Sequence, residues 1–202
     1  MLKLVNASVK KQSKLIQLPD LSLAAGEIVG LSGPSGCGKS TLAMVLANMQ
    51  TLHSGAVIQG HDSQKKVTKH QPNNVQWVSQ QPEFAFNPRW TLQRSLAESH
   101  PIDDAQLARY KVDKAWLNRF PHQLSGGELQ RLNLVRALAP TTEYLLCDEI
   151  TAQLDPLTQQ DIWQALCQEV EERQLALLVI SHDSYLLEAL TDRIVRFDDV
   201  NT

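Results

Sequence analysis

The chain has 202 residues, of which 43% are hydrophobic, and its 19 Lys and Arg against 22 Asp and Glu give a formal net charge of -3. This length and composition predict one hydrophobic core with at most a small subdomain, and the charge lacks the basic excess of a dedicated nucleic-acid-binding protein. The N-terminus has no secretory signal, the longest apolar runs are too short to span a membrane and the three cysteines form no disulfide framework, so we expect a cytoplasmic protein. A local basic cluster has the character of a solvated turn: Lys65, Lys66, Lys69 and His70.

The first elements in chain order are strands and one helix. Residues 2–9 alternate loosely between apolar and polar, like an edge strand. Residues 27–32 (EIVGLS) form a short buried strand that runs into a glycine-rich loop, and residues 41–49 (TLAMVLANM) then have helical composition. Residues 75–78 (VQWV) are a further strand candidate.

The middle of the chain changes in composition between 82 and about 121, where four prolines separate short polar helical segments. We interpret this part as a small, mostly helical insertion. A helix is predicted to follow from Glu128, because apolar residues recur there at helical spacing. These residues are Leu129, Leu132, Val135 and Leu138.

The last third of the chain alternates between strands and helices. Residues 143–147 and 175–180 are predicted as buried strands, and the helix predicted at 156–174 lies between them. A helix near 185–190 and a strand at 193–197 complete the pattern. Buried strands that alternate with helices predict an α/β fold with a mostly parallel sheet.

The glycine-rich loop GPSGCGKST has the spacing G-x-x-x-x-G-K-S of a P-loop. Its glycines allow backbone N–H groups to surround an anion, and the following helix points its N-terminal dipole at the same place. Lys39 would reach the β- and γ-phosphates and Ser40 would bind Mg²⁺. The predicted nucleotide-binding residues here are Gly33, Pro34, Ser35, Gly36, Cys37, Gly38, Lys39, Ser40 and Thr41. The loop alone leaves a kinase, a GTPase, a helicase and a motor open.

Two carboxylates end the buried run YLLCDE, residues 144–149. A strand there would place Asp148 at its carboxyl end beside the P-loop, where it can hold the Mg²⁺ shell. Glu149 would face the γ-phosphate and polarise an attacking water. A solvated acidic turn is the alternative, and the P-loop upstream argues against it.

A second glycine-rich segment, LSGGELQR at 124–131, also precedes a helix and predicts another anion site. One chain that binds one ATP does not need two such sites. The economical explanation is a dimer in which this segment contacts the γ-phosphate bound by the other chain.

Taken together, these motifs resemble the nucleotide-binding subunits of ATP-binding cassette (ABC) proteins, and they occur in the order of that family over nearly the whole chain. GPSGCGKST resembles Walker A, YLLCDE resembles Walker B with the catalytic glutamate, and LSGGE resembles the ABC signature with Glu128 where glutamine is commonest. Gln80 in VSQQP is similar to the Q-loop glutamine, with Gln81 as a rival. AQLD, which ends at Asp155, resembles the D-loop, and His182 in ISHD resembles the switch histidine.

The resemblance implies a P-loop ABC-type ATPase core with a mostly parallel sheet, an N-terminal antiparallel β part and a small helical subdomain. The whole chain, residues 1–202, would form a single ABC domain. Its ATP-binding core would consist of residues 1–81 together with 141–202, and its helical subdomain of residues 82–140. Two subunits would close head to tail around two MgATP.

The resemblance also implies the role of each site residue. Ser40, Gln80 and Asp148 would organise Mg²⁺, with Lys39 on the phosphates. The catalytic residues would be Glu149, His182 and Lys39, with Glu149 as the general base or water-orienting group and His182 holding it in register. The remaining nucleotide contacts would come from the signature in trans and from the D-loop: Ser125, Gly126, Gly127 and Asp155. Asp155 before Pro156 is also a helix N-cap candidate.

A narrower likeness links residues 79–92 (SQQPEFAFNPRWTL) and 121–131 (PHQLSGGELQR) to the ATPases of dipeptide, oligopeptide and nickel importers. It implies transmembrane permease subunits, an external solute-binding protein, a position on the inner face of the cell membrane and no nucleic acid. The partner ATPase would be a second copy or a sister chain. NPR as a simple turn into a helix is the alternative.

The chain departs from the family where an aromatic ring normally stacks on the adenine. No Phe, Trp or Tyr precedes Trp77, and the matching region, 8–14, offers Lys10 and Lys11. We therefore expect weak nucleotide affinity or poor base selectivity. The rival functions are a soluble ABC ATPase that acts on DNA or ribosomes, a metabolite kinase and an ATP-binding scaffold that does not hydrolyse ATP.

Overall fold

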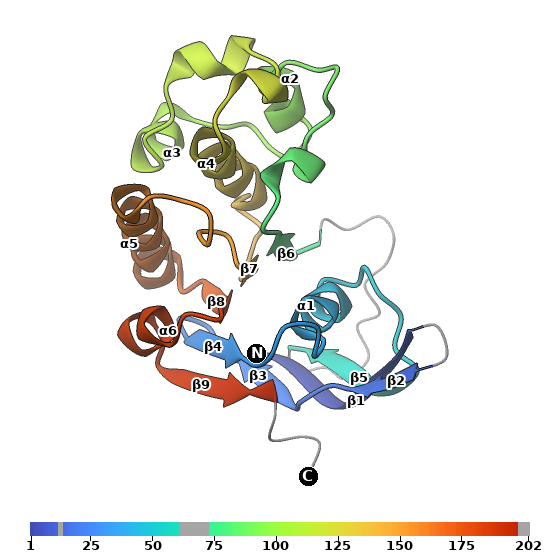
Figure 1. Cartoon of the computed structure of the whole chain (residues 1–202). Helices are drawn as coiled ribbons and strands as arrows, with labels where there is room; N and C mark the ends of the chain where they lie inside the picture. Colours follow the sequence, from blue (N-terminus) through green and yellow to red (C-terminus); the bar gives the residue numbers. More distant parts are fainter. Residues whose placement is uncertain (12–13, 61–72, 198–202) are drawn as a thin grey trace.

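The computed structural model describes residues 1–11, 14–60 and 73–197 (Figure 1). The basic cluster at 65–70 therefore lies outside the described residues. Two sheets form the lower part of the molecule, and a group of short helices covers its upper end (Figure 1).

The antiparallel sheet is built around β1 (Leu2–Lys11), which pairs with β2 (Lys14–Gln17), β3 (Leu21–Leu23) and β5 (Ser54–Gln59). The prediction of an edge strand at 2–9 is wrong, because Leu2 pairs with Leu23 on one side and with Gln59 on the other. The alternation of apolar and polar residues indicates that one face of a strand is buried, but it does not indicate whether the strand lies at the edge or the centre of its sheet.

The second sheet is parallel throughout, in the order β6-β7-β8-β4-β9. Its strands are β6 (Val75–Val78), β7 (Tyr144–Asp148), β8 (Ala176–Ile180), β4 (Ile28–Ser32) and β9 (Arg193–Arg196). Every residue of β7 and β8 is buried, as their continuous apolar runs predict. The predicted α/β class is confirmed.

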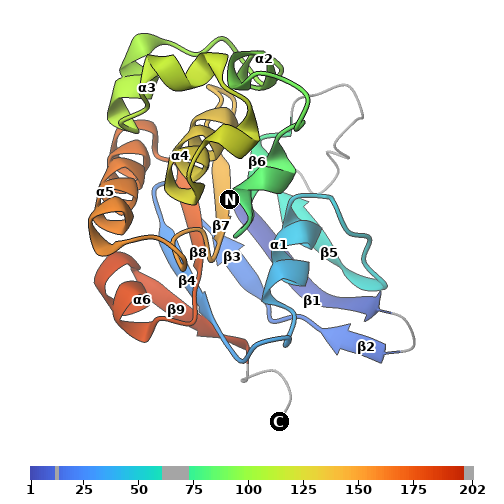
Figure 2. The same ribbon diagram turned by 45° about the horizontal axis from the view of Figure 1, so that its top comes forward.

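Helices flank the parallel sheet on both faces: α1 (Lys39–Leu46) lies toward the antiparallel sheet, and α5 (Pro156–Arg173) and α6 (Ser184–Leu190) lie on the other side (Figures 1 and 2). Helix α1 begins and ends before the predicted 41–49. It ends early because the chain turns at Asn48, which has a left-handed φ of 59°.

The helical part follows β6, as predicted, and each of its short α-helices starts at a polar cap. It contains η1 (Pro82–Ala85), α2 (Leu92–Ala97), α3 (Asp104–Arg109), η2 (Lys114–Asn118), η3 (Pro121–Gln123) and α4 (Gly126–Ala137). Thr91, Asp103 and Ser125 accept the capping hydrogen bonds of α2, α3 and α4. The cap at Ser125 lets α4 begin two residues before the predicted Glu128.

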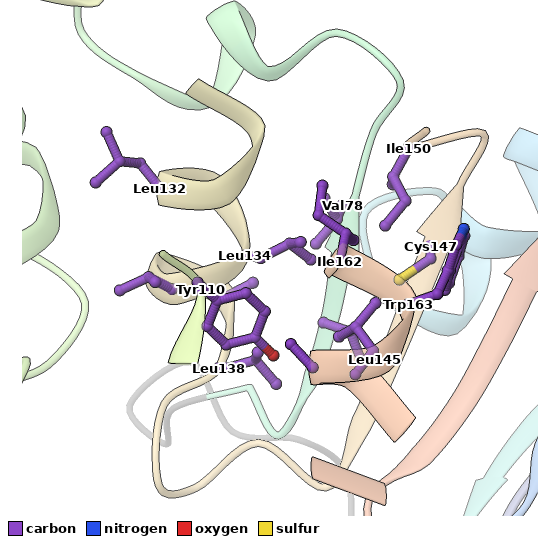
Figure 3. Packing of buried hydrophobic residues seen from close by; sticks show 14 of the residues in the cluster. Val78, Tyr110, Leu132, Leu134, Leu138, Leu145, Cys147, Ile150, Ile162 and Trp163 are labelled. Atoms are coloured by element: carbon purple, nitrogen blue, oxygen red, sulfur yellow. The ribbon is translucent and has the colours of Figure 1, made fainter. Parts of the chain in front are cut away.

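The helical part and the parallel sheet share one core. The apolar stripe predicted for α4 is buried. Leu134, which lies outside that stripe, points toward Ile162 of α5 and Val78, whereas Leu132 points to the opposite side of the helix (Figure 3). Burial of each leucine contributes about 1.5–3 kcal/mol. This packing fixes the position of α4 against the sheet that carries the P-loop and Asp148.

Candidate active site

The P-loop follows β4 and needs glycine at several positions. Gly33, Gly36 and Gly38 have φ angles of 154°, 79° and 123°, a region that L side chains rarely adopt. A Cβ atom on Gly33 would lie 2.6 Å from Cβ of Phe197, and one on Gly38 would lie 3.0 Å from Cζ of the same ring. The chain therefore passes close to Phe197 at both ends of the loop.

The amino end of α1 is open to an anion. Gly38 occupies the N-cap position and provides no side-chain hydrogen bond to the first N–H groups of the helix. These groups and the helix dipole together attract negative charge. The geometry thus has the form that the sequence predicts for phosphate binding.

Lys39 brings a full positive charge to the loop. Its side chain is buried, and its ammonium donates hydrogen bonds to the carbonyl oxygens of Gly33 at 2.7 Å and Pro34 at 3.0 Å. The ammonium is therefore folded back across the loop, where it can neutralise a phosphate.

Three predicted Mg²⁺ ligands, Ser40, Gln80 and Asp148, line one cleft of about 630 Å³. The pKa of the Asp148 carboxyl is raised, mainly by burial and also by the charge of Glu149, although a hydrogen bond from Ser40 and the charge of Lys39 act in the opposite direction. Burial disfavours the ionised form, so a cation beside this carboxylate would be stabilising. Hydroxyl, amide and carboxylate oxygens are the hard ligands that Mg²⁺ prefers, so this donor set fits the ion. Within the described residues, no group of three or more His, Cys, Asp or Glu side chains could hold a metal.

Glu149 and His182 come together after the neighbouring strands β7 and β8. Oε1 of Glu149 lies 3.6 Å from Nδ1 of His182. Glu149 has a left-handed φ of 52°, and its N–H donates to the carbonyl of Ile180 at 3.0 Å. Such a φ costs a non-glycine residue on the order of 1–3 kcal/mol, and the hydrogen bond to the end of β8 helps to hold it. The strained turn aims the carboxylate away from the strand and toward His182.

The signature segment forms a capping box. The N–H of Glu128 donates to Oγ of Ser125 at 3.3 Å, and the N–H of Ser125 donates to Oε2 of Glu128 at 2.7 Å. Glu128 therefore fixes the start of α4, a role that glutamic acid and glutamine share at this position.

Ser125, Gly126, Gly127 and Asp155 line a second cleft of about 530 Å³. Residues 33–41, all described, do not line it, whereas Gln80 borders both clefts. The structure therefore does not bring the signature to the P-loop of the same chain.

Asp155 is the N-cap of α5, as predicted, with Pro156 at the first helical position. The N–H of Thr158 donates to Oδ1 of Asp155 at 3.0 Å. The Thr158 hydroxyl and this backbone N–H lower the pKa of Asp155. The cap places Asp155 in the lining of the second cleft, which also contains the signature residues Ser125, Gly126 and Gly127.

Sequence reasoning missed two apolar neighbours of the P-loop. Besides Phe197, Ile16 of β2 would lie 3.2 Å from a Cβ atom on Gly38. Neither residue carries a signal in the sequence, because their proximity arises only when both sheets form. Lys10 and Lys11, in the region where an aromatic ring was sought, are exposed.

Comparisons with known proteins agree with this geometry. The family model described as "ABC transporter" matches residues 16–152. The nickel import system ATP-binding protein NikE of Staphylococcus aureus (strain bovine RF122 / ET3-1) is 31% identical over 211 residues, which cover 98% of this chain and 86% of that protein. NikE of strain N315 has the same identity and coverage.

Solved structures of similar shape are ABC cassettes. A dimer of the ATP-binding cassette MJ0796 bound to ADP and Pi has a TM-score of 0.81 and 25% identity, covering 97% of this chain and 94% of that chain. A dimeric structure described as MJ0796, a bacterial ABC transporter cassette, has a TM-score of 0.76 and 26% identity with the same coverage. In the described part of the chain, no helix is both long and apolar enough to cross a membrane.

Proposed function

The chain belongs to the ABC transporter family, and from that premise we propose how it uses ATP. It is the ATP-binding and ATP-hydrolysing subunit of an ABC transporter, and its fold is that of an ABC ATPase cassette. The soluble ABC ATPase considered as a rival is not favoured by these relatives. The residue roles, the domain division, the use of Mg²⁺ and the partners are proposals.

Two subunits close head to tail, so that the signature of each completes the nucleotide site of the other. The observation that carries this proposal is that, on one chain, the cleft lined by Ser125, Gly126 and Gly127 includes none of the P-loop residues 33–41. The dimeric MJ0796 structures support it. Residues 82–140 act as the helical subdomain that carries the signature, against a core of 1–81 and 141–202.

The P-loop amides and Lys39 hold the phosphates, and Ser40, Asp148 and Gln80 hold Mg²⁺. When bound, Mg²⁺ neutralises charge that develops on the phosphates. The remaining residues position groups and stabilise charge. Glu149 orients the attacking water and accepts its proton, and His182 keeps the Glu149 carboxylate in register at the observed 3.6 Å.

Ser125, Gly126 and Gly127 contact the γ-phosphate of the partner's nucleotide through the amino end of α4, with Asp155 beside them. This arrangement makes hydrolysis depend on closure of the dimer. Closure and opening then move transmembrane permease subunits, which place this chain at the inner face of the cell membrane.

The transported solute is a nickel ion or a small solute of the same importer group, such as a peptide, delivered by an external solute-binding protein. The similarity to NikE supports this choice. The second ATPase is either another copy or a sister chain, and no nucleic acid is involved.

Affinity capture tests the transporter assignment. Tagged Glu149→Gln protein, held in the closed state with MgATP, is added to solubilised native membranes. Polytopic membrane proteins are expected in the capture, together with any sister ATPase, whereas capture of soluble partners or nucleic acid alone would contradict the proposal.

A further inference from the structure

Helices α4 and α5 lie side by side and run in the same direction (Figure 2). Their amino ends border the same cleft, since Ser125 and Asp155 both line it. At the other end, Arg173 of α5 donates to the carbonyl oxygens of Ala139 and Thr142, just beyond α4. Parallel helix dipoles repel, and three kinds of contact oppose this repulsion in addition to the shared apolar core.

The first attachment is close packing at the amino ends. A Cβ atom on Gly127 would lie 3.4 Å from Cγ2 of Thr158 and 3.6 Å from Cδ2 of Leu154. The signature backbone thus lies in contact with the segment that forms the D-loop. Apolar contacts of this kind oppose separation of the two helix ends, but they are not directional.

The second attachment is an ion pair between the helices. The Arg131 guanidinium, 10% exposed, donates to Oδ2 of Asp161 at 3.2 Å and to the carbonyl of Tyr110 at 3.1 Å. Lys111 also donates to Asp161, at 2.8 Å. Arg131 belongs to the signature sequence, and Asp161 lies less than two turns beyond Asp155.

The third attachment lies toward the carboxyl end of α5. The buried carboxylate of Glu169 binds Arg109 of α3 at 2.8 Å and Arg173 at 2.9 Å. This cluster anchors the far end of the helical part, whereas the Arg131–Asp161 pair is the ionic attachment near the cleft. Movement of the signature relative to the D-loop would therefore stretch the Arg131–Asp161 pair as well as the apolar contacts between α4 and α5.

We propose that Asp161 is a positioning residue for hydrolysis: through Arg131 it fixes the signature to the D-loop, so that both reach the partner's nucleotide as one unit. This inference rests on the proposed head-to-tail dimer. Neither Asp161 nor Arg131 touches the nucleotide in this scheme, and the effect passes through the relative placement of the two helix ends.

The test compares Glu149→Gln with Glu149→Gln/Asp161→Asn in light-scattering titrations of dimer formation in MgATP. The lost charge leaves Arg131 poorly compensated, and the dimer is expected to weaken about tenfold. Binding of ATP to the monomer at low protein concentration should not change, because the P-loop is untouched. Asp161→Glu should restore most of the dimer affinity.

The matched control is Asp104→Asn in the same background. Asp104 pairs with Lys114 at 2.7 Å, but the two side chains are 80% and 63% exposed and the pair lies away from both clefts. It should leave dimer formation unchanged, since exposed ion pairs contribute little.

The outcomes separate the inference from the proposed function. If Glu149→Gln itself stays monomeric in MgATP, the head-to-tail dimer fails and this inference fails with it. If it dimerises and Asp161→Asn dimerises equally well, only the inference is overturned. Weaker ATP binding by the Asp161→Asn monomer would also overturn it, by showing a general loss of structure.

Discussion

Gly38→Ala should weaken ATP binding strongly, for two reasons that can be separated. A side chain at the φ of 123° costs about 1–2 kcal/mol, and the approach of its Cβ atom to 3.0 Å from Phe197 adds about 1 kcal/mol of crowding. The loop can relieve this strain only by leaving its anion-binding shape. A cost of about 2–3 kcal/mol corresponds to binding that is weaker by about 30- to 150-fold.

Two other glycines isolate the causes. Gly36 in the same loop has a φ of 79° with nothing within 4 Å of an added Cβ atom. In the ATP-free protein, Gly36→Ala should therefore have only the conformational cost of the positive φ and no cost from crowding. Gly60 has a φ of 76° and equally open surroundings but follows β5, outside the P-loop, so Gly60→Ala should lower stability without changing ATP affinity.

The assay is equilibrium titration with ATP in the Glu149→Gln background, alongside thermal unfolding of each variant. Phe197→Leu combined with Gly38→Ala should recover part of the affinity by removing the ring tip. Wild-type ATP affinity in Gly38→Ala would refute the reasoning, as would equal losses in Gly38→Ala and Gly60→Ala.

Three further predictions follow from the site. Glu149→Gln should retain ATP binding but lower steady-state ATPase turnover by about a hundredfold or more, and unchanged turnover would remove Glu149 from its role. GTP should be hydrolysed with a kcat/KM within about tenfold of that for ATP, because no aromatic residue precedes Trp77 in the sequence to stack on the base; hydrolysis of ATP alone would contradict this. Lys111 and Arg131 lower the pKa of Asp161, so their ion pairs stabilise the fold above about pH 4 and this contribution is lost as the pH falls through the lower folded pKa. Acid unfolding curves of the wild type and Asp161→Asn should therefore converge at low pH, and a constant separation would count against the ion pairs.

The sequence predicts best those elements whose local pattern has one physical meaning. The short apolar runs that form β7 and β8 favour strands buried on both faces. The spacing of the glycines and Lys39 in the P-loop predicts the anion-binding conformation of that loop. Ser125 followed by Glu128 is a capping box in the sequence as well as in the structure. These signals are local, so tertiary contacts reinforced them without altering them.

Strand pairing and contacts between distant parts of the chain were harder to predict from the sequence. Strand β5 was not predicted, because most of its residues are exposed and a glycine interrupts it, and it exists by pairing with β1. The central position of β1 follows from that same pairing. Ile16 and Phe197 come from opposite ends of the chain and meet only around the P-loop. Their role depends on distances that no spacing along the sequence encodes.

Glu128 shows how a departure from the family pattern can be compatible with the site. A carboxylate at the amino end of α4 is favoured by the helix dipole, yet it brings negative charge to the place where a partner's phosphate would bind. The hydrogen bond from the N–H of Ser125 to Oε2 at 2.7 Å draws the carboxylate back toward the N-cap. Gly126, in contrast, has nothing within 4 Å of its missing side chain, so its backbone remains accessible. The capping box therefore separates the two functions of this helix end: the side chain of Glu128 stabilises the first turn, and the glycine backbone is left to meet the phosphate.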